Sequence, residues 1–140
     1  MSHPATYPKL VSQKLTVDFR SSTGIATATW QEPGRGQVVI RNRYAGCNAI
    51  FDKNLCRNSV RYVDVKPPFD MGIESVGHVV AVGEGVTGLV EGDAIATSKL
   101  GTGYREYQLA DVSRVIKVRE ASPQILALIP SGISAMVGLE

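Results

Sequence analysis

The chain has 140 residues, of which 44% are hydrophobic and 20% are charged. This length suits one domain and is too short for two full α/β domains, and the composition is that of a globular protein. The formal net charge is +2, and the basic residues are scattered, so nothing indicates a nucleic-acid partner. No apolar run reaches the roughly 18 to 20 residues of a membrane-spanning helix, so no membrane partner is expected.

Segments rich in Val, Ile and Thr recur along the chain between Gly, Asp and Pro residues. Rough alternation of apolar and polar residues between such turn residues is typical of strands. The predicted strands, in chain order, are Gln13–Asp18, Thr23–Trp30, Gln37–Tyr44, Glu74–Val82, Ala94–Ser98, Arg105–Ala110 and Ser113–Lys117. They indicate a mainly β domain that curls into a barrel, because open sheet edges promote aggregation.

The C-terminal residues follow a different pattern. From Pro123 onwards the chain becomes rich in Ala, Leu and Met, and Ser122 is suited to cap a helix that starts at Pro123. Pro130 is expected to interrupt this helix, with a second helix starting at Ser131.

The segment Cys47–Asp70 fits neither a helical nor a strand period. It is polar, and loops of this kind on a rigid β scaffold commonly carry binding and catalytic residues. Its two cysteines, Cys47 and Cys56, are expected to be reduced, because the start of the chain has no secretion signal and disulfides are rare inside cells.

Gly83–Gly88 matches G-x-G-x-x-G and follows a predicted strand. A dinucleotide-binding motif of this form needs a helix of ten or more residues directly after it. Here another strand begins at Ala94, which leaves no room for that helix. The glycines are therefore interpreted as turn residues between antiparallel strands.

Several short motifs, taken in order, resemble the medium-chain dehydrogenase/reductase superfamily. They are Gly46-Cys47-Asn48, the run Lys66–Glu74, Gly77, Val80–Gly83 and Gly92-Asp93. Arg41-Asn42-Arg43 and the KPPFD run are most similar to the zinc-free, quinone-oxidoreductase-like branch that includes the prostaglandin reductases.

This resemblance implies a GroES-like, partly open β-barrel over residues 13–121. Residues 1–12 are expected to form a flexible segment that precedes it. Residues 122–140 are expected to form short helices that lead towards a Rossmann domain absent from these 140 residues.

Comparison with zinc-dependent members of the superfamily predicts that this chain binds neither catalytic nor structural zinc. Those members have a Cys at the position of Asn48 and a His-Glu pair at the position of Ile73-Glu74, and the Cys-rich lobe of their structural site is missing here. Cys47 lies one residue away, which on an extended segment turns its side chain to the opposite face. Too few ligands remain for tetrahedral zinc. Glu74 is expected to pair with an arginine or a backbone N–H.

The resemblance implies that Asn48 and Asp52 line the catalytic cleft, with Asn48 also beside the nicotinamide. A neutral amide there would donate a hydrogen bond to an oxygen that gains negative charge. The alternative is that both residues only satisfy backbone groups of the loop, as Asx residues often do. Tyr62 and Ser131 are the other residues expected to contact the cofactor, although a tyrosine at such a position is equally often only packed or half-exposed.

The implied function is that of the substrate-binding domain of an NADPH-dependent oxidoreductase that reduces the activated C=C bond of an enone or a quinone. The isolated chain, without a nucleotide-binding domain, is expected to bind no NADPH and to be inactive. The alternative is a stand-alone binding or interaction module of GroES-like fold. The expected partners are a small carbonyl or quinone compound and a second copy, bound through the face that the missing domain would cover. The expected compartment is cytoplasmic, with the peroxisome as the alternative.

Overall fold

The computed structural model describes residues 3–139, apart from the side chains of Ser131 and Ile133. Its strands are β1 (Thr6–Ser12), β2 (Thr23–Thr29), β3 (Gln37–Ala45), β4 (Phe69–Asp70), β5 (Glu74–Val82), β6 (Ala94–Ser98), β7 (Tyr107–Asp111) and β8 (Val115–Lys117). Its helices are α1 (Phe19–Ser22), α2 (Ala49–Cys56), the 3-10 turn Val112–Arg114 and α3 (Pro123–Gly138).

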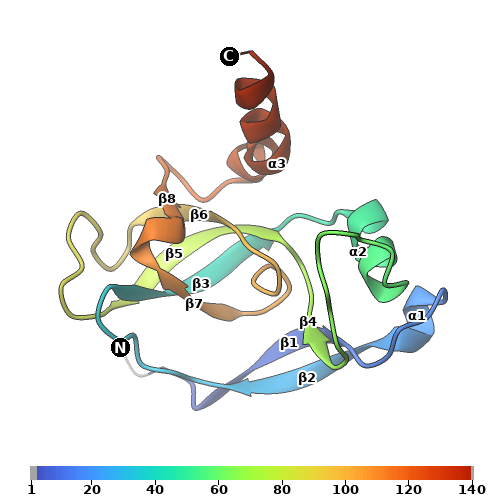
Figure 1. The fold of residues 1–140 in the computed structure, drawn as a ribbon. Helices are drawn as coiled ribbons and strands as arrows, with labels where there is room; N and C mark the ends of the chain where they lie inside the picture. The colour runs from blue at the N-terminus through green and yellow to red at the C-terminus, as the bar shows by residue number, and fades with distance from the viewer. Residues whose placement is uncertain (1–2, 140) are drawn as a thin grey trace.

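The strands form two antiparallel sheets, and α3 projects from one end of the larger sheet (Figure 1). The larger sheet has the order β7-β3-β5-β6-β8 and the smaller one β2-β1-β4. The sheets meet where β1 contacts the segment before β7, through a bridge between Lys9 and Arg105 and a 2.8 Å hydrogen bond from Leu10 N to Tyr104 O. This arrangement confirms the prediction of a mainly β, partly open barrel.

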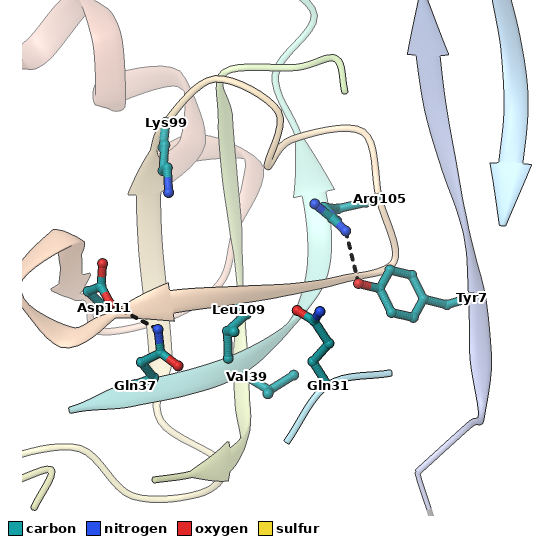
Figure 2. Close-up of a pocket in the computed structure, with 8 residues that line it drawn as sticks. All are labelled: Tyr7, Gln31, Gln37, Val39, Lys99, Arg105, Leu109 and Asp111. Carbon is teal, nitrogen blue, oxygen red and sulfur yellow. Dashed lines mark hydrogen bonds between the residues drawn. The ribbon is translucent and has the colours of Figure 1, made fainter. Parts of the chain in front are cut away.

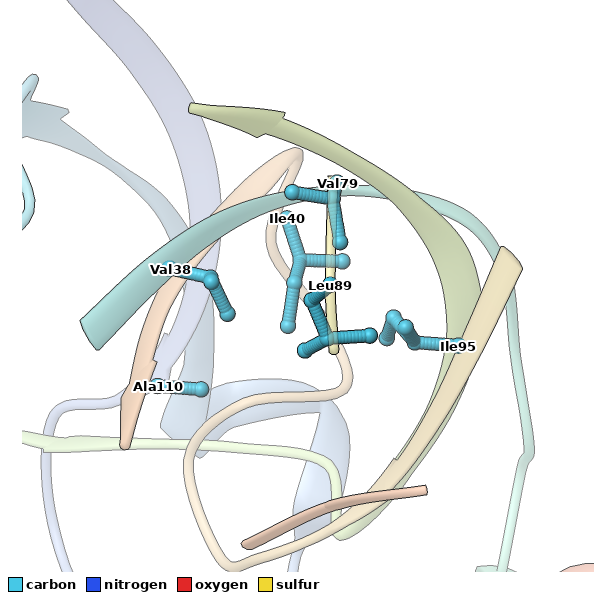
Figure 3. Packing of buried hydrophobic residues seen from close by; sticks show 6 residues of the cluster. All are labelled: Val38, Ile40, Val79, Leu89, Ile95 and Ala110. Carbon is cyan, nitrogen blue, oxygen red and sulfur yellow. The ribbon is translucent and has the colours of Figure 1, made fainter. Parts of the chain in front are cut away.

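The core of the larger sheet is a cluster of aliphatic side chains that point to one side of the curled sheet (Figure 3). Its members are Val38, Ile40, Val79, Leu89, Ile95 and Ala110. Each fully buried Val, Leu or Ile side chain contributes about 1.5 to 3 kcal/mol to folding, so this cluster is a main source of the stability of the barrel.

The first strand differs from the sequence prediction. A strand was expected over 13–18 and a flexible segment over 1–12, whereas residues 6–12 form β1. Proline is unfavourable within a strand because it has no N–H to donate. At Pro8 the backbone groups face the loop before β7 and not β2, and Pro8 O accepts a hydrogen bond from Glu106 N. Its missing N–H therefore costs no bond to β2.

The C-terminal helix also differs. The sequence predicts an interruption at Pro130, but α3 runs unbroken from Pro123 to Gly138. Proline removes one helical hydrogen bond. The helix persists because Leu126 and Ile129 pack on Val76 and Ala96 of the sheet. Between residues 3 and 139, no helix is long and apolar enough to cross a membrane.

The Gly83–Gly88 segment is the connection between β5 and β6, as predicted. Gly85 and Gly88 have φ angles of 73° and 83°, and no helix follows them before β6 begins. Positive φ is the reason for glycine at these two positions.

Candidate functional site

Helix α2 carries the two residues predicted to be catalytic, Asn48 as its N-cap and Asp52 within it, and the sequence analysis did not predict this helix. It begins after Asn48, whose Oδ1 accepts a hydrogen bond of 3.1 Å from Phe51 N. An Asn at this position satisfies one of the free N–H groups at the helix start. Asn48 therefore does make the backbone contact expected of an Asx residue.

Asn48 and Tyr62 line the same pocket of about 470 Å³, which we call the Asn48 pocket. Ile50, Phe51 and Arg61 also line it. The Tyr62 side chain is 81% exposed, so its phenol is accessible to solvent and to a ligand. The structure thus brings together two of the residues predicted to form a site.

Asp52 lines a different pocket, which we call the Cys47 pocket. This pocket has a volume of about 440 Å³, and its other lining residues include Leu10, Phe19, Cys47, Ala49 and Tyr104. Asn48 does not line it, so α2 separates the two residues predicted to act together. The reason is that Asn48 is the N-cap, whose side chain folds back to the helix start, whereas Asp52 lies within the helix and points into the domain.

The Asp52 carboxyl is 2% exposed and accepts a 2.6 Å hydrogen bond from the Tyr104 hydroxyl. Its other oxygen, Oδ1, is buried without a hydrogen-bond partner. Burial raises the pKa of Asp52, and the bond from Tyr104 opposes this rise. Burial, together with the bond to Asp52 and its charge, raises the pKa of the Tyr104 phenol far above its ordinary value. Tyr104 is therefore the proton donor of this pair.

The prediction that Glu74 pairs with an arginine or a backbone N–H is wrong. Neither partner is found within the described part of the chain, and Glu74 Oε2 is buried without a hydrogen bond. The carboxyl instead packs against Gly46, where any Cβ would collide with it. Burial raises the pKa of Glu74, and the charge of Asp52 adds to the rise.

A buried polar network holds the loop that carries Tyr104. Gln108, which is 1% exposed, donates from Nε2 to Asn42 Oδ1 at 2.6 Å and to Ser75 Oγ at 2.8 Å. Asn42 Nδ2 in turn donates to the backbone oxygens of Thr102 and Arg105 at 2.9 and 2.8 Å. Buried polar groups satisfied in this way fix a loop in one conformation. The network therefore sets the position of Tyr104 relative to α2.

Sequence reasoning did not identify Tyr104, but a signal for it was present. Tyr104 follows Gly101 and Gly103, and the loop packs closely against Gly72, where a Cβ would lie 2.6 Å from Tyr104 N. Gly72 and Gly101 both have positive φ angles, of 82° and 84°. Such a cluster of glycines marks a close approach of two backbones.

A third, more polar pocket lies between the two sheets (Figure 2). Lys99 and Arg105 extend into it from the loop after β6, over Leu109 of β7. Arg105 donates to the Tyr7 hydroxyl at 2.9 Å and to Asp70 at 3.2 Å. None of the residues predicted for the site lines this pocket, so its charged groups form a separate cluster.

The last predicted site residue, Ser131, lies in α3, and its side chain is outside the described part of the structure. Both cysteines are free thiols; Cys47 is exposed and Cys56 is buried. Among residues 3–139, no three His, Cys, Asp or Glu side chains gather in an arrangement that would hold a metal ion.

Comparison with known proteins gives a family match over most of the barrel. The family model described as the alcohol dehydrogenase GroES-like domain matches residues 34–120. Over 140 aligned residues the chain is 37% identical to a probable quinone oxidoreductase of Leishmania amazonensis and 32% identical to prostaglandin reductase-3 of Mus musculus. These alignments cover 99% and 98% of this chain but only 40% and 36% of the two relatives.

The fold also matches solved structures. A mycobacterial protein determined in complex with NADPH superimposes with a TM-score of 0.75 at 24% identity, over 96% of this chain and 40% of that protein. The 140 residues thus correspond to one part of longer proteins in both comparisons.

Proposed function

Because this chain belongs to the alcohol dehydrogenase GroES-like domain family, we propose that it is the substrate-binding domain of an NADPH-dependent oxidoreductase. Its proposed substrates are enones or quinones, of which the activated C=C bond is reduced. The names of the quinone oxidoreductase and prostaglandin reductase relatives support an oxidoreductase acting on small carbonyl compounds. The fold relative bound to NADPH supports the choice of cofactor.

The observation that carries this proposal is the orientation of the Asn48 amide. Its Oδ1 is engaged by Phe51 N, which leaves the Nδ2 donor as the group available to a ligand in the Asn48 pocket. A fixed donor stabilises a carbonyl oxygen as it gains negative charge, and it does so without reorganising. Asn48 thereby combines the capping role with the polarising role.

The described residues do not form a nucleotide fold, because the only G-x-G-x-x-G match in the sequence is the β5–β6 turn. When bound, NADPH supplies the hydride. We assign to Asn48 and Tyr62, at the edge of the Asn48 pocket, and to Ser131 of α3 the task of contacting it. The nucleotide itself would need a further domain.

We assign to Asp52 a positioning role rather than contact with the reacting atoms. Its carboxyl is buried and bonded to Tyr104, and it lines the Cys47 pocket on the other side of α2 from Tyr62. The pair fixes α2, and hence the start of the helix at Asn48, against the barrel.

Zinc is not assigned to this site. A tetrahedral zinc site needs about four ligands of the Cys, His or carboxylate type. At the positions where zinc-dependent members of the superfamily have ligands, the chain offers the amide of Asn48, which is engaged in helix capping, and Ile73, which has no ligand atom. The carboxyl of Asp52 is already bonded to Tyr104.

A stand-alone interaction module is the second candidate. It is favoured by exposed apolar side chains at the C-terminal end of α3, where Met136 and Val137 are 69% and 71% exposed and Leu139, directly after the helix, is 88% exposed. Such a surface promotes self-association in the absence of a covering domain. Sedimentation of the 140-residue chain over a range of concentrations distinguishes a monomer from a self-associating module.

The experiment begins with the reading frame after Glu140. If it encodes a strand, a G-x-G-x-x-G turn and a helix, the complete protein is expressed and NADPH oxidation is followed with an enone and with its saturated ketone. We expect turnover of the enone alone. A frame that ends without a nucleotide fold, or a complete protein that does not oxidise NADPH with any enone or quinone, contradicts the proposal.

Asn48 is then tested with two variants. Asn48→Asp retains an oxygen that caps α2 but removes the amide donor, whereas Asn48→Ala removes both. We expect kcat to fall by roughly 100-fold in each, the order of magnitude for losing one donor to a developing oxyanion, with the thermal midpoint reduced only in Asn48→Ala. If Asn48→Asp keeps its turnover, Asn48 only caps the helix.

A further inference from the structure

We propose that strand β2 is a docking surface for a second copy of this chain, and that the two β2 strands pair antiparallel about Thr27 to form one continuous sheet. β2 lies at the outer edge of the smaller sheet, at the opposite end of the molecule from α3 (Figure 1). The inference concerns assembly, and it does not depend on the reaction proposed above.

One side of the β2 backbone has hydrogen-bonding groups without a partner. The bond from Gln13 N to Ser22 O, at the start of the β1–β2 pair, fixes which residues of β2 bond to β1, because the register continues without a bulge. Even-numbered residues of β2 bond to β1, so the N–H and C=O groups of Ile25, Thr27 and Thr29 point away from it. Within residues 3–139, β1 is the only strand that pairs with β2. These three residues therefore offer six backbone groups to an added strand.

β2 also lacks the features that commonly protect a sheet edge, which are short length, charged residues and proline. The other edges of the two sheets have such features: β4 has two residues and follows Pro67-Pro68, and β8 has three residues and ends at Lys117. The fourth edge, β7, starts at the contact with the smaller sheet described above. In contrast, residues 21–31 contain no charge and no proline, and Ile25 is 74% exposed. β2 is thus the edge best suited to pair with another strand.

The sequence of β2 is complementary to itself. A two-fold axis at Thr27 places Ile25 of each copy opposite Thr29 of the other, so the three free residues are all matched. Their side chains share the exposed face of β2, where Thr–Thr contacts across the axis stabilise an antiparallel pair. An axis at Ala26 would instead set Thr29 against Thr23, which directly adjoins α1. The axis at Thr27 keeps the added strand clear of that helix.

The charges at the two ends of β2 favour antiparallel pairing of two copies. Arg20 precedes the strand and makes no ion pair with a described residue, and the exposed Glu32 follows it. Asp18 also precedes the strand, but its carboxyl caps α1 by accepting a hydrogen bond from Arg20 N. Antiparallel pairing brings the start of one strand to the end of the other, so Arg20 approaches Glu32 at both ends. Parallel pairing would bring like charges together, which is unfavourable.

Sedimentation velocity of the 140-residue chain over a range of concentrations tests the association. We expect a reversible dimer and no larger species, because each copy uses its one long free edge and the two-fold pair is closed. Thr27→Lys places two ammonium groups opposite each other at the axis and should weaken dimerisation by about tenfold or more. The Thr27 side chain is exposed, so the fold should be retained.

Two further lysine variants serve as controls. Thr87→Lys makes the same change at an exposed position of the β5–β6 connection and should leave dimerisation unchanged. Val137→Lys alters the exposed apolar end of α3 and should also leave it unchanged. This second control separates the β2 contact from self-association through α3.

The register is tested by disulfide formation in a Cys47→Ser background, in which the remaining cysteine, Cys56, is buried. Opposite residues of a hydrogen-bonded pair have Cα atoms about 5.5 Å apart, a distance that a disulfide can span. Thr27→Cys should therefore form a disulfide-linked dimer with diamide as the oxidant. Two copies of Ile25→Cys would lie more than about 13 Å apart and should not be linked. A mixture of Ile25→Cys and Thr29→Cys chains should be linked to each other.

A chain that stays monomeric at every concentration overturns the proposal. So does association that is lost in Val137→Lys and retained in Thr27→Lys, which would assign the contact to α3. If Thr27→Lys does not fold, the cysteine variants decide, and linking of Ile25→Cys as fast as Thr27→Cys contradicts the pairing about Thr27. None of these measurements involves NADPH oxidation by the complete protein, so the proposed function is tested separately.

Discussion

The Tyr104 hydroxyl donates a 2.6 Å hydrogen bond to the buried carboxyl of Asp52, and this bond joins the loop before β7 to the helix α2. The two residues are 52 positions apart in the sequence. The bond has a structural consequence, because it is the hydrogen bond that satisfies the Asp52 carboxyl, whose other oxygen has no partner.

Tyr104→Phe should destabilise the fold by about 1 to 3 kcal/mol, because it leaves the Asp52 carboxyl buried with neither oxygen bonded. The free energy of unfolding in urea measures this loss. Tyr44→Phe is the matched control: Tyr44 is 37% exposed on β3, and its hydroxyl makes no hydrogen bond to any described residue. Equal stability of Tyr104→Phe and the unmodified chain would mean that the bond contributes nothing in solution.

Glu74 makes stability decrease as pH rises. Its pKa in the folded chain is raised above the ordinary value of 4.5, so the folded state holds its proton at a pH where the unfolded state has lost it. Its stabilising contribution is therefore complete below pH 4.5 and is lost as pH rises towards the folded pKa.

Glu74→Gln should consequently flatten the fall in unfolding free energy above pH 4.5 and make the chain more stable than the parent at pH 7. Urea unfolding at a series of pH values measures the slope. Glu91→Gln, at an exposed turn position, should leave the slope unchanged. If the unfolding free energy of Glu74→Gln falls with pH as steeply as that of the parent, Glu74 is not the titrating group.

The 140-residue chain by itself should not bind NADPH measurably. Asn48 and Tyr62, two of the residues assigned to the cofactor, line a single pocket, and the glycine-rich turn before β6 has no helix with which to bind a pyrophosphate. Nicotinamide fluorescence, titrated with micromolar protein, measures this. A saturable change in that fluorescence would contradict the expectation and reveal a nucleotide site within the barrel.

Purified protein should contain less than one zinc per chain, because Asn48 and Ile73 offer no metal ligands of the usual type. Elemental analysis after expression with added zinc measures the content. Cys47→Ser should not alter it, since the thiol lies in the Cys47 pocket without a set of partner ligands among residues 3–139. A one-to-one content that Cys47→Ser abolishes would assign the thiol to a zinc site instead.

Strands with a clear period and no competing signal could be predicted from the sequence. Residues 94–98 were predicted with the bounds that the structure has, and 74–82 likewise, because their Val and Ile residues lie between turn-forming glycines and aspartates. β1 was missed because Pro8 lowers its strand propensity, and whether its missing N–H matters depends on which side of the strand has a partner.

The sequence by itself determined the class of fold and the turn at Gly83–Gly88, and it indicated the segment 47–70 as the place of the candidate site, since these follow from local periodicity, turn chemistry and the order of short motifs. Only the tertiary structure decided how that site is divided. It placed Asn48 with Tyr62 on one side of α2, and Asp52 with Cys47 and Tyr104 on the other. The physical reason is that these groupings depend on helix capping and on contacts across more than 50 residues of sequence, which no local pattern encodes.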